Sequence, residues 1–551
     1  MLIETDEGSG PAADVCAADG ALHLVLQAEQ LKNPDAVISV TGHEKGERLI
    51  EFADGIQGLA TSDNSQFIAQ FWEFPKLEEG WEWFQMAPAR TTYVAGCSQV
   101  LHWQDGEGSY MEHALSLKAE NRLGGWKSGG EAWGKVGVAV NRVGSLPVAL
   151  YRGHLFDCNV AMIVPRDPAH VPAVWAFCQS EMYAPAVRKV NAKLAVTNVT
   201  LTKVPFDLAH WQRVAAEKYP NGLPQPQSDD PTQWMFHGHP AKTPASLALQ
   251  VAVARLVGYR WPAELAADMR LAPEARAWVE RCKALDGFAD DDGVVPLAPM
   301  RGEPAAEGRV RDLLRAAFGG GWSGAKEATV LATVATANGG GGDKEPAASL
   351  DDWLRNRFFA EHCALFDNRP FVWHLWDGRK KDGFGVLVHY HRLAAPNGEG
   401  RRLLEKITHG YLGDWIVRQR DEVRGNKEGA DARLAAALDL QKKLEAILQG
   451  DPPHDIFVRW KPLHKQPIGW EPDLNDAVRM NIRPFVEAGV LRDRLNIKWT
   501  TDRGQEPKSI RPKAEFPWFW DGATFIGDRV NDIHLTADQK QKARGAKESH
   551  T

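Results

Sequence analysis

The hydrophobic pattern between residues 133 and 207 predicts a small buried sheet. Three apolar runs rich in β-branched and aromatic residues follow one another there, at 136–140, 146–151 and 156–164. Runs of this length, bounded by polar or glycine-containing turns, favour strands. A polar loop at 193–198 follows, and we expect a last strand over residues 199–205.

A helix is expected between these strands and the polar loop. Asp167 can cap its first turn, and Pro168 has the backbone angle that a first helical position requires. Apolar residues then recur at helical spacing and predict one buried face: Val171, Val174, Trp175, Cys178 and Met182. The segment holds no set of acids, nucleophiles or metal ligands, so we interpret it as a surface that binds.

The rest of the chain predicts a mixed, α+β fold. Strands are expected at 37–40 and 48–52, and helices from Leu22 and over 247–256. Within 58–74, a turn and helix-cap cluster at 61–64 is expected to precede a further amphipathic helix. Ser349 with Asp352 resembles a capping box at the start of a further helix. A β-hairpin is expected from 371–376 and 384–391, and a helical hairpin from 401–424 and 430–448.

Changes in composition divide the chain into six parts. We expect a sheet fragment at 1–57, a short-stranded domain with a packed helix at 58–219, and a mixed helical domain at 232–336. A Gly-rich linker at 337–348 then leads to an α+β domain with the helical hairpin at 349–535. A polar tail at 536–551 ends the chain.

Composition indicates an ordinary globular protein of the cytoplasm. Apolar residues make up 44% of the 551 residues and the net charge is −7, so bulk charge does not indicate a nucleic-acid binder. The six cysteines include no Cys-x-x-Cys pair, which argues against a structural zinc site. Apolar runs are too short to cross a membrane, and the acidic start is unlike a signal peptide.

Motifs for catalysis are weak throughout the sequence. A Walker loop and a Gly-x-Ser-x-Gly elbow are both absent, and the one Asn-Pro pair, Asn33-Pro34, is followed by Asp35. The histidine pairs 237/239 and 389/391 are interpreted as structural. Glu471, Asp473 and Asp476 could bind a divalent ion, which leaves a metal-dependent nuclease open as an alternative.

Several long motifs resemble one family. GLATSDNSQFIAQFWEF, AWGKVGVAV, FDCNVAMIVP and KLAVTNVTLTKVPFDLAHW, with WHLWDG and QPIGWEPDLNDAVRMNIRPF further on, are similar to DISARM-type adenine-specific DNA methyltransferases of bacterial phage defence. PglX of BREX and type IIG restriction–modification enzymes are wider relatives of that family. The similarity runs from about Gln27 almost to the end.

The resemblance implies the target-recognition half of such an enzyme. Residues 1–57 would then be the end of a methyltransferase domain whose catalytic half is absent, and 58–219 would be the target-recognition domain. The family's S-adenosylmethionine site and Asn-Pro-Pro-aromatic loop have no counterpart here, so the cofactor is expected in a catalytic partner, and this chain alone is expected to be inactive.

Double-stranded DNA is therefore the expected partner, together with a methyltransferase catalytic subunit or other defence-system proteins. Polar loop residues are the candidate contacts, because arginine and lysine bind phosphates while asparagine and threonine read base edges. They are Thr61, Asp63, Asn64, Trp133, Lys135, Arg152, Lys193, Thr197 and Asn198. A non-catalytic scaffold of a defence complex remains a further alternative.

Overall fold

The computed structural model describes residues 13–15, 22–24, 28, 31, 46–74, 77, 79–119, 127–225, 238–260, 262–338, 345–459, 461–472, 480–493, 495–496, 510–526 and 534–550. The chain forms two compact units, each of which is described by itself. Unit 1 comprises residues 1–62 and 79–226, and unit 2 comprises residues 63–78 and 227–551. Both units mix helices with small sheets, so the expected mixed α/β fold is confirmed.

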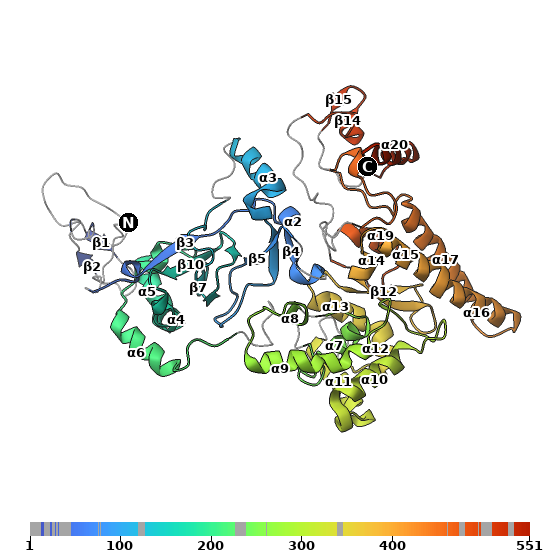
Figure 1. The fold of residues 1–551 in the computed structure, drawn as a ribbon, viewed down its shortest axis with the longest axis horizontal. Coiled ribbons are helices and arrows are strands. Elements are labelled where there is room, and N and C mark those ends of the chain that lie inside the picture. The colour runs from blue at the N-terminus through green and yellow to red at the C-terminus, as the bar shows by residue number, and fades with distance from the viewer. Residues whose placement is uncertain are drawn as a thin grey trace. The chain divides into compact units, whose positions relative to one another are not determined.

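An antiparallel sheet forms the centre of unit 1, with the strand order β3-β10-β7-β8 (Figure 1). Its strands are β3 (Ala53–Gln57), β7 (Gly137–Asn141), β8 (Val148–Tyr151) and β10 (Val160–Pro165). A second group pairs β5 (Trp81–Gln85) with β6 (Gln99–His102) and β9 (Leu155–Phe156). The short strands β1 (Ala13–Val15) and β2 (Leu22–Leu24) pair with each other, and α3 (Gly108–Ala119) follows β6.

Both faces of the central sheet are buried, which explains its almost continuous apolar runs. Along β10, Ala161 and Ile163 point to one core while Val160, Met162 and Val164 point to the other, as the two-residue period of a strand requires. The first core is closed by α4 (Val171–Cys178), α5 (Tyr183–Val190) and α6 (Leu208–Lys218).

The expected strands are confirmed apart from their ends. Range 136–140 corresponds to β7, range 146–151 to β8, and range 156–164 to β9 and β10 together. The cap at Asp167 is also confirmed, since its carboxylate accepts from Ala169 N at 2.9 Å, and a 3-10 turn at Pro168–His170 leads into α4. Met182 does not share the buried face. It lies in the turn between α4 and α5, and 64% of it is exposed.

Three expectations in unit 1 are wrong. Residues 199–205 form a 3-10 turn, Thr200–Thr202, because Thr197 Oγ1 accepts from Thr200 N and Thr202 Oγ1 donates to the Val199 carbonyl. Residues 48–52 also form a 3-10 turn, and the strand begins only at Ala53. Leu22–Leu24 is a strand and not the start of a helix. The expected strand at 37–40 lies outside the described residues.

Unit 2 is largely helical (Figure 1). It also contains an antiparallel sheet with the strand order β11-β13-β12. The strands are β11 (Val294–Pro296), β12 (Val372–Trp376) and β13 (Gly385–His389), which confirms the expected β-hairpin. The helices before it are α7 (Ala248–Leu256), α8 (Pro262–Leu265), α9 (Pro273–Cys282), α10 (Ala306–Phe318), α11 (Gly324–Asn338), α12 (Leu350–Asn356) and α13 (Phe358–Leu365).

The expected helical hairpin is present after this sheet. Its first arm runs through α15 (Glu399–Glu405), a π-helical segment (Lys406–Tyr411) and α16 (Leu412–Arg424), and its second arm is α17 (Ala430–Gln449). The remaining elements are α14 (Tyr390–Leu393), α19 (Arg483–Glu487), β14 (Trp520–Asp521), β15 (Thr524–Phe525) and α20 (Ala537–His550). The polar tail is thus a helix, anchored by the fully buried Ala543.

Residues 63–78 belong to unit 2. The sequence predicts a capping turn at Thr61–Asn64 and then a helix that carries Phe67, Ile68, Phe71 and Trp72. The segment holds only α2 (Asn64–Phe67), strand β4 (Ile68–Gln70) and a 3-10 turn at Phe71–Glu73. Trp72 is buried in unit 2, where its indole N–H donates to the Arg369 carbonyl at 3.1 Å and its own carbonyl accepts from His391 Nε2. Burial of this large ring outweighs the local helical preference.

Candidate nucleic-acid interface

The strand register divides the candidate residues of unit 1 between the two ends of the central sheet. Trp133 and Lys135 precede β7, and Arg152 follows β8, which ends opposite the beginning of β7. Lys193 lies at the other end, because its neighbour Ala195 pairs with Val143 just beyond β7. Asn198 returns to the first end, where its side-chain amide donates to the Gly55 carbonyl at 2.6 Å. Lys135 and Asn198 are therefore brought together, whereas Lys193 is kept apart from them.

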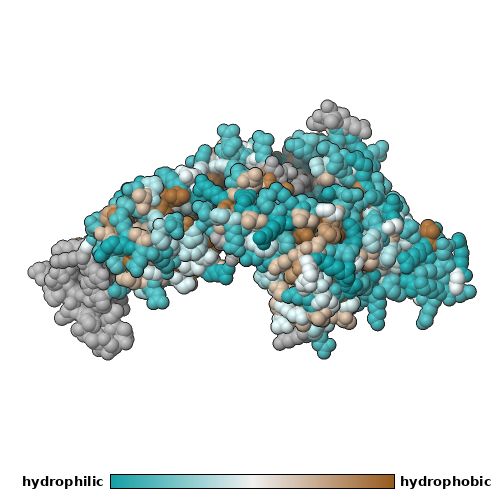
Figure 2. Space-filling model, turned by 60° about the horizontal axis from the view of Figure 1, so that its bottom comes forward, coloured by the Kyte–Doolittle hydropathy of each residue, from teal (hydrophilic) through white to brown (hydrophobic). Residues whose placement is uncertain are grey.

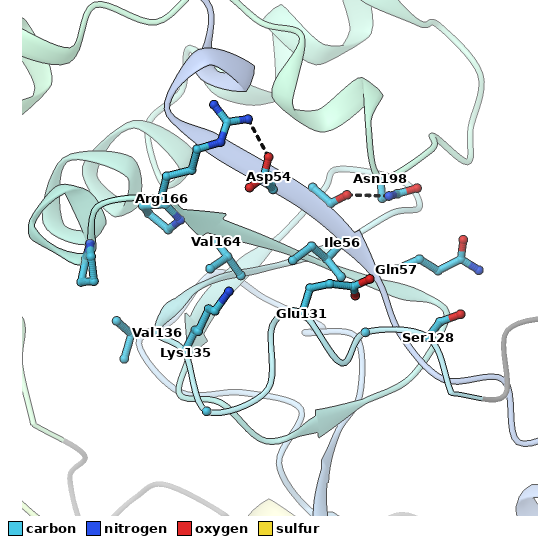
Figure 3. A pocket seen from close by; sticks show the side chains of 15 residues that line it. Asp54, Ile56, Gln57, Ser128, Glu131, Lys135, Val136, Val164, Arg166 and Asn198 are labelled. Carbon is cyan, nitrogen blue, oxygen red and sulfur yellow. Dashed lines mark hydrogen bonds and ion pairs between the residues drawn. The ribbon is translucent and has the colours of Figure 1, made fainter. Parts of the chain in front are cut away.

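A pocket of about 870 Å³ lies at the first end of the sheet (Figure 3). Ile56, Val136 and Val164 supply its apolar wall, and Lys135 and Asn198 lie at its border. Gly55 is required beside it, because a Cβ there would lie 2.3 Å from the Asn198 carbonyl oxygen. The crossing of the Asn198 loop over β3 thus depends on the absence of a side chain at residue 55.

Charges of both signs line this pocket. Arg166 forms an ion pair with Asp54 at 2.7 Å, both side chains being about half exposed, and Glu131 balances Lys135. An exposed pair of this kind contributes little stability, roughly 0–1 kcal/mol. The balance of charge makes the pocket a poor site for phosphate but leaves polar groups suited to a neutral, hydrogen-bonding ligand.

The loop at residues 191–199, which we name the recognition loop, is held by two arginines. Arg142 donates from Nε to the Val196 carbonyl at 2.9 Å and from a terminal nitrogen to the Cys158 carbonyl at 2.8 Å. Arg188 donates to the carbonyls of Lys193, Gly144 and Leu194. Guanidinium–carbonyl bonds of this sort fix a loop that has no regular structure of its own.

Positively charged side chains gather on and beside the recognition loop. The two guanidinium groups bond to carbonyls, and within the described part of the chain neither forms an ion pair with a carboxylate. Residues 182–206 contain four Lys/Arg and no Asp or Glu. Lys193 and Thr197 are exposed on this loop. The result is a rigid, locally cationic projection on a chain whose net charge is negative.

Trp133 and Arg152 are both half-buried. The Trp133 ring packs edge-on against Trp103, with 5.4 Å between centroids, and contributes to the second core of the sheet. Arg152 is half-buried beside His154, and burial together with the Arg152 charge lowers the pKa of His154 to about 4. Their role as DNA contacts stays a prediction.

The division between the two units falls inside the Thr61–Asn64 cluster. Thr61 belongs to unit 1 and is 3% exposed, so its side chain offers almost no surface for DNA. Asp63 and Asn64 belong to unit 2, where the Asp63 carbonyl accepts from Phe67 N at the start of α2. The cluster acts locally as a turn and helix start, and its role as a DNA contact stays a prediction.

The alternative metal site cannot be assembled from described residues. Glu471 forms an ion pair with Lys547 at 2.6 Å, while Asp473 and Asp476 lie outside the described residues. Within the described ranges, no group of three or more His, Cys, Asp or Glu residues is placed to hold a metal. His389 and His391 are buried with 5.1 Å between ring centroids, and burial lowers the pKa of His391 to about 4.

The arrangement defines a mixed α/β protein with an arginine-held cationic loop in unit 1. No family model matches the chain, and no curated protein is significantly similar to it. Among the described helices, none has the length and apolar character needed to cross a bilayer. The face shown in Figure 2 is mostly hydrophilic, with separate hydrophobic spots among the described residues.

Sequence reasoning missed the residues that hold the recognition loop in place: Gly55, Arg142 and Arg188. Arg142 and Arg188 act on segments up to 54 residues away, so spacing gives no sign of their role. One signal was present in the sequence, namely the acid-free stretch from 182 to 206. Local charge, rather than the net charge of the chain, would have drawn attention to the recognition loop.

Proposed function

We propose that unit 1 binds double-stranded DNA in a sequence-selective way and serves as the target-recognition part of an adenine-specific DNA methyltransferase system. The observation that carries the proposal is the recognition loop. Arg142 and Arg188 hold it through its carbonyls, a stretch around it has no acidic residue, and it presents Lys193 and Thr197 to solvent. Lysine supplies phosphate contacts, and threonine can bond to base edges.

Rigidity favours selective binding over a merely electrostatic contact. A loop already fixed in one conformation loses little conformational entropy on binding, so that its hydrogen bonds can discriminate between bases. Asn198 has a different part in the proposal. Its amide is bonded to Gly55, so it anchors the loop to β3 and positions Thr197 beside it.

Methyl transfer itself is assigned to a catalytic partner. The sequence contains no Asn-Pro-Pro-aromatic loop that could hold an extruded adenine. In the proposal the partner binds S-adenosylmethionine and transfers the methyl group, and this chain selects the DNA sequence that is methylated. Phage defence by restriction–modification is the setting that the motif resemblance supports.

Gel-shift titration of the full chain against salt tests DNA binding. Binding should weaken linearly in a log–log plot, and Lys193→Ala should reduce the slope by about 0.9 for one lost phosphate contact. Lys283→Ala is the matched control, because that lysine lies on unit 2 and is already paired with Glu280. Salt-insensitive association, or an unchanged slope in Lys193→Ala, would contradict the proposal.

Two further measurements separate the alternatives. The first measures methyl incorporation into DNA by the chain mixed with a co-purified catalytic subunit. Incorporation by the mixture, with none by either protein alone, supports the methyltransferase role. Magnesium-dependent cutting by the chain alone, abolished in Asp473→Ala, would favour the nuclease instead.

A further inference from the structure

The pocket at the first end of the central sheet has walls that are held by the fold itself. Most of them come from β3, from β10 and from the segment 128–136. The backbone fixes this segment, since Gly134 N donates to the Gly153 carbonyl at 3.0 Å. Gly129 packs so closely that a Cβ there would lie 2.9 Å from the Phe156 ring. The volume of the pocket, about 870 Å³, is typical of small-molecule sites, which span roughly 300–1,000 Å³.

Two side chains of opposite charge, Lys135 and Glu131, line this pocket. In Figure 3 the Lys135 side chain extends towards Val164 and the Glu131 side chain towards Ile56. Both are exposed, and within the described part of the chain neither forms an ion pair or a side-chain hydrogen bond. The ammonium and the carboxylate are therefore available to a ligand.

The other charged pair at the pocket is occupied by contacts within the protein. Arg166 donates to the Asp54 carboxylate at 2.7 Å and to the Glu51 carbonyl at 2.8 Å. Lys135 and Glu131 then present one positive and one negative charge, so that a charged ligand would be attracted by one and repelled by the other. A neutral ligand with hydrogen-bond donors on one edge and acceptors on another satisfies both groups.

Guanine matches this requirement better than the other nucleobases. Its N1–H and N2 amino group are adjacent donors that suit the two oxygens of a carboxylate, and its O6 and N7 accept from an ammonium group. Adenine and cytosine place one amino group beside an acceptor nitrogen, and thymine and uracil flank one N–H with two carbonyls, so a carboxylate meets acceptors in each of them. Ile56, Val136 and Val164 provide apolar surface for the faces of the ring.

We propose that the pocket binds a guanine base, with Glu131 accepting from N1–H and from the N2 amino group and with Lys135 donating to O6. The base can come from a free nucleoside or nucleotide, or from a guanine extruded from DNA, because both sources present the same edges. Only the second source rests on the proposed DNA binding.

Isothermal titration calorimetry of the full chain with guanosine and with inosine tests the proposal. Inosine lacks only the N2 amino group, so it should bind roughly ten- to a hundred-fold more weakly, as expected for one lost hydrogen bond to a charged group. In Glu131→Gln this preference should fall below about three-fold, because a neutral amide has one acceptor oxygen and no charge. Glu217→Gln, at an exposed position on α6, is the matched control and should keep the full preference.

A second titration separates the two sources of the base. It uses a duplex with one guanine opposite an abasic site, since an unpaired base is extruded at little cost, and the same duplex with hypoxanthine in place of that guanine. A preference for guanine that appears with the free nucleosides supports a free ligand. A preference that appears only in the duplex, and that Glu131→Gln removes, supports an extruded base.

Equal binding of guanine and hypoxanthine in both titrations would overturn the inference, and so would a preference that Glu131→Gln keeps. Neither result depends on the salt titration with ordinary duplex DNA. Salt-insensitive DNA binding together with an intact preference for guanosine would remove the proposed function and leave the guanine site standing.

Discussion

Arg142 and Val196 are joined by two hydrogen bonds that run in opposite directions. The Val196 N–H donates to the Arg142 carbonyl at 3.0 Å, and Arg142 Nε donates to the Val196 carbonyl at 2.9 Å. One bond uses the backbone and the other uses the side chain, so the end of β7 and the recognition loop are fixed in both position and direction.

Replacing Arg142 by lysine should loosen the recognition loop without unfolding unit 1. Lysine has one ammonium group and cannot reach the carbonyls of Val196 and Cys158 together. Losing one charged hydrogen bond, about 1.5–3 kcal/mol, should speed exchange of the Val196 amide by about ten- to a hundred-fold. Hydrogen-exchange mass spectrometry measures this. Arg213→Lys, at an exposed position on α6, should leave the exchange unchanged.

Replacing Gly55 by alanine should displace the Asn198 segment. The new Cβ would lie 2.3 Å from the Asn198 carbonyl oxygen, and backbone cannot yield as a flexible side chain can. We expect unit 1 to lose about 1–3 kcal/mol of unfolding free energy in urea. Gly130→Ala is the control, because its Cβ would meet nothing closer than the Trp133 ring at 3.9 Å. Equal stability of the two variants would contradict this account.

Trp72→Ala should destabilise unit 2 by about 3–5 kcal/mol, since it empties a fully buried site. Trp72→Phe should cost less, because the aromatic contact with Phe366 is partly kept while the bond to the Arg369 carbonyl is lost. Thermal unfolding followed by circular dichroism measures both variants. Trp322→Ala, at a half-buried position in the same unit, should change stability by less than either. A small loss in Trp72→Ala would show that residues 63–78 do not anchor in unit 2.

Unit 2 should lose stability in mild acid through His362. Its Nε2 accepts from Val372 N at 3.2 Å and its Nδ1 faces Gln250 Oε1, so the ring must stay neutral, and burial lowers its pKa to about 3. The unfolded chain binds this proton near pH 6.5 and the folded chain does not. Stability is therefore full above about pH 6.5 and falls as the pH drops towards 3, by up to about 1.4 kcal/mol per pH unit.

Urea unfolding at pH 7, 6, 5 and 4 measures this slope. His362→Gln should flatten it by close to one proton, whereas His409→Gln should not, because the His409 side chain is 55% exposed. An unchanged slope in His362→Gln would assign the acid sensitivity to other groups.

Local pattern was sufficient where the structure depends on neighbours in sequence. The continuous burial of β7, β8 and β10, the Asp167 cap and the hairpin of β12 with β13 all follow from the apolar runs and from capping chemistry. Ser349 behaves the same way, since its hydroxyl accepts from Asp352 N at 3.1 Å. Lys135 and Asn198, chosen from sequence, do lie at one pocket.

Tertiary contacts decided what the sequence could not. Trp72 placed residues 63–78 in unit 2, because burying its indole outweighs the helix that the local pattern favours. Arg142 and Arg188 hold the polar loop in place by donating hydrogen bonds to backbone carbonyls. Every residue has such a carbonyl, so no pattern of side chains in the sequence predicts these bonds. The sequence alone predicted the mixed fold, the short strands and a polar loop near residue 193 as a candidate binding surface. Which atoms hold that loop follows only from contacts between distant parts of the chain, because its partners are backbone carbonyls.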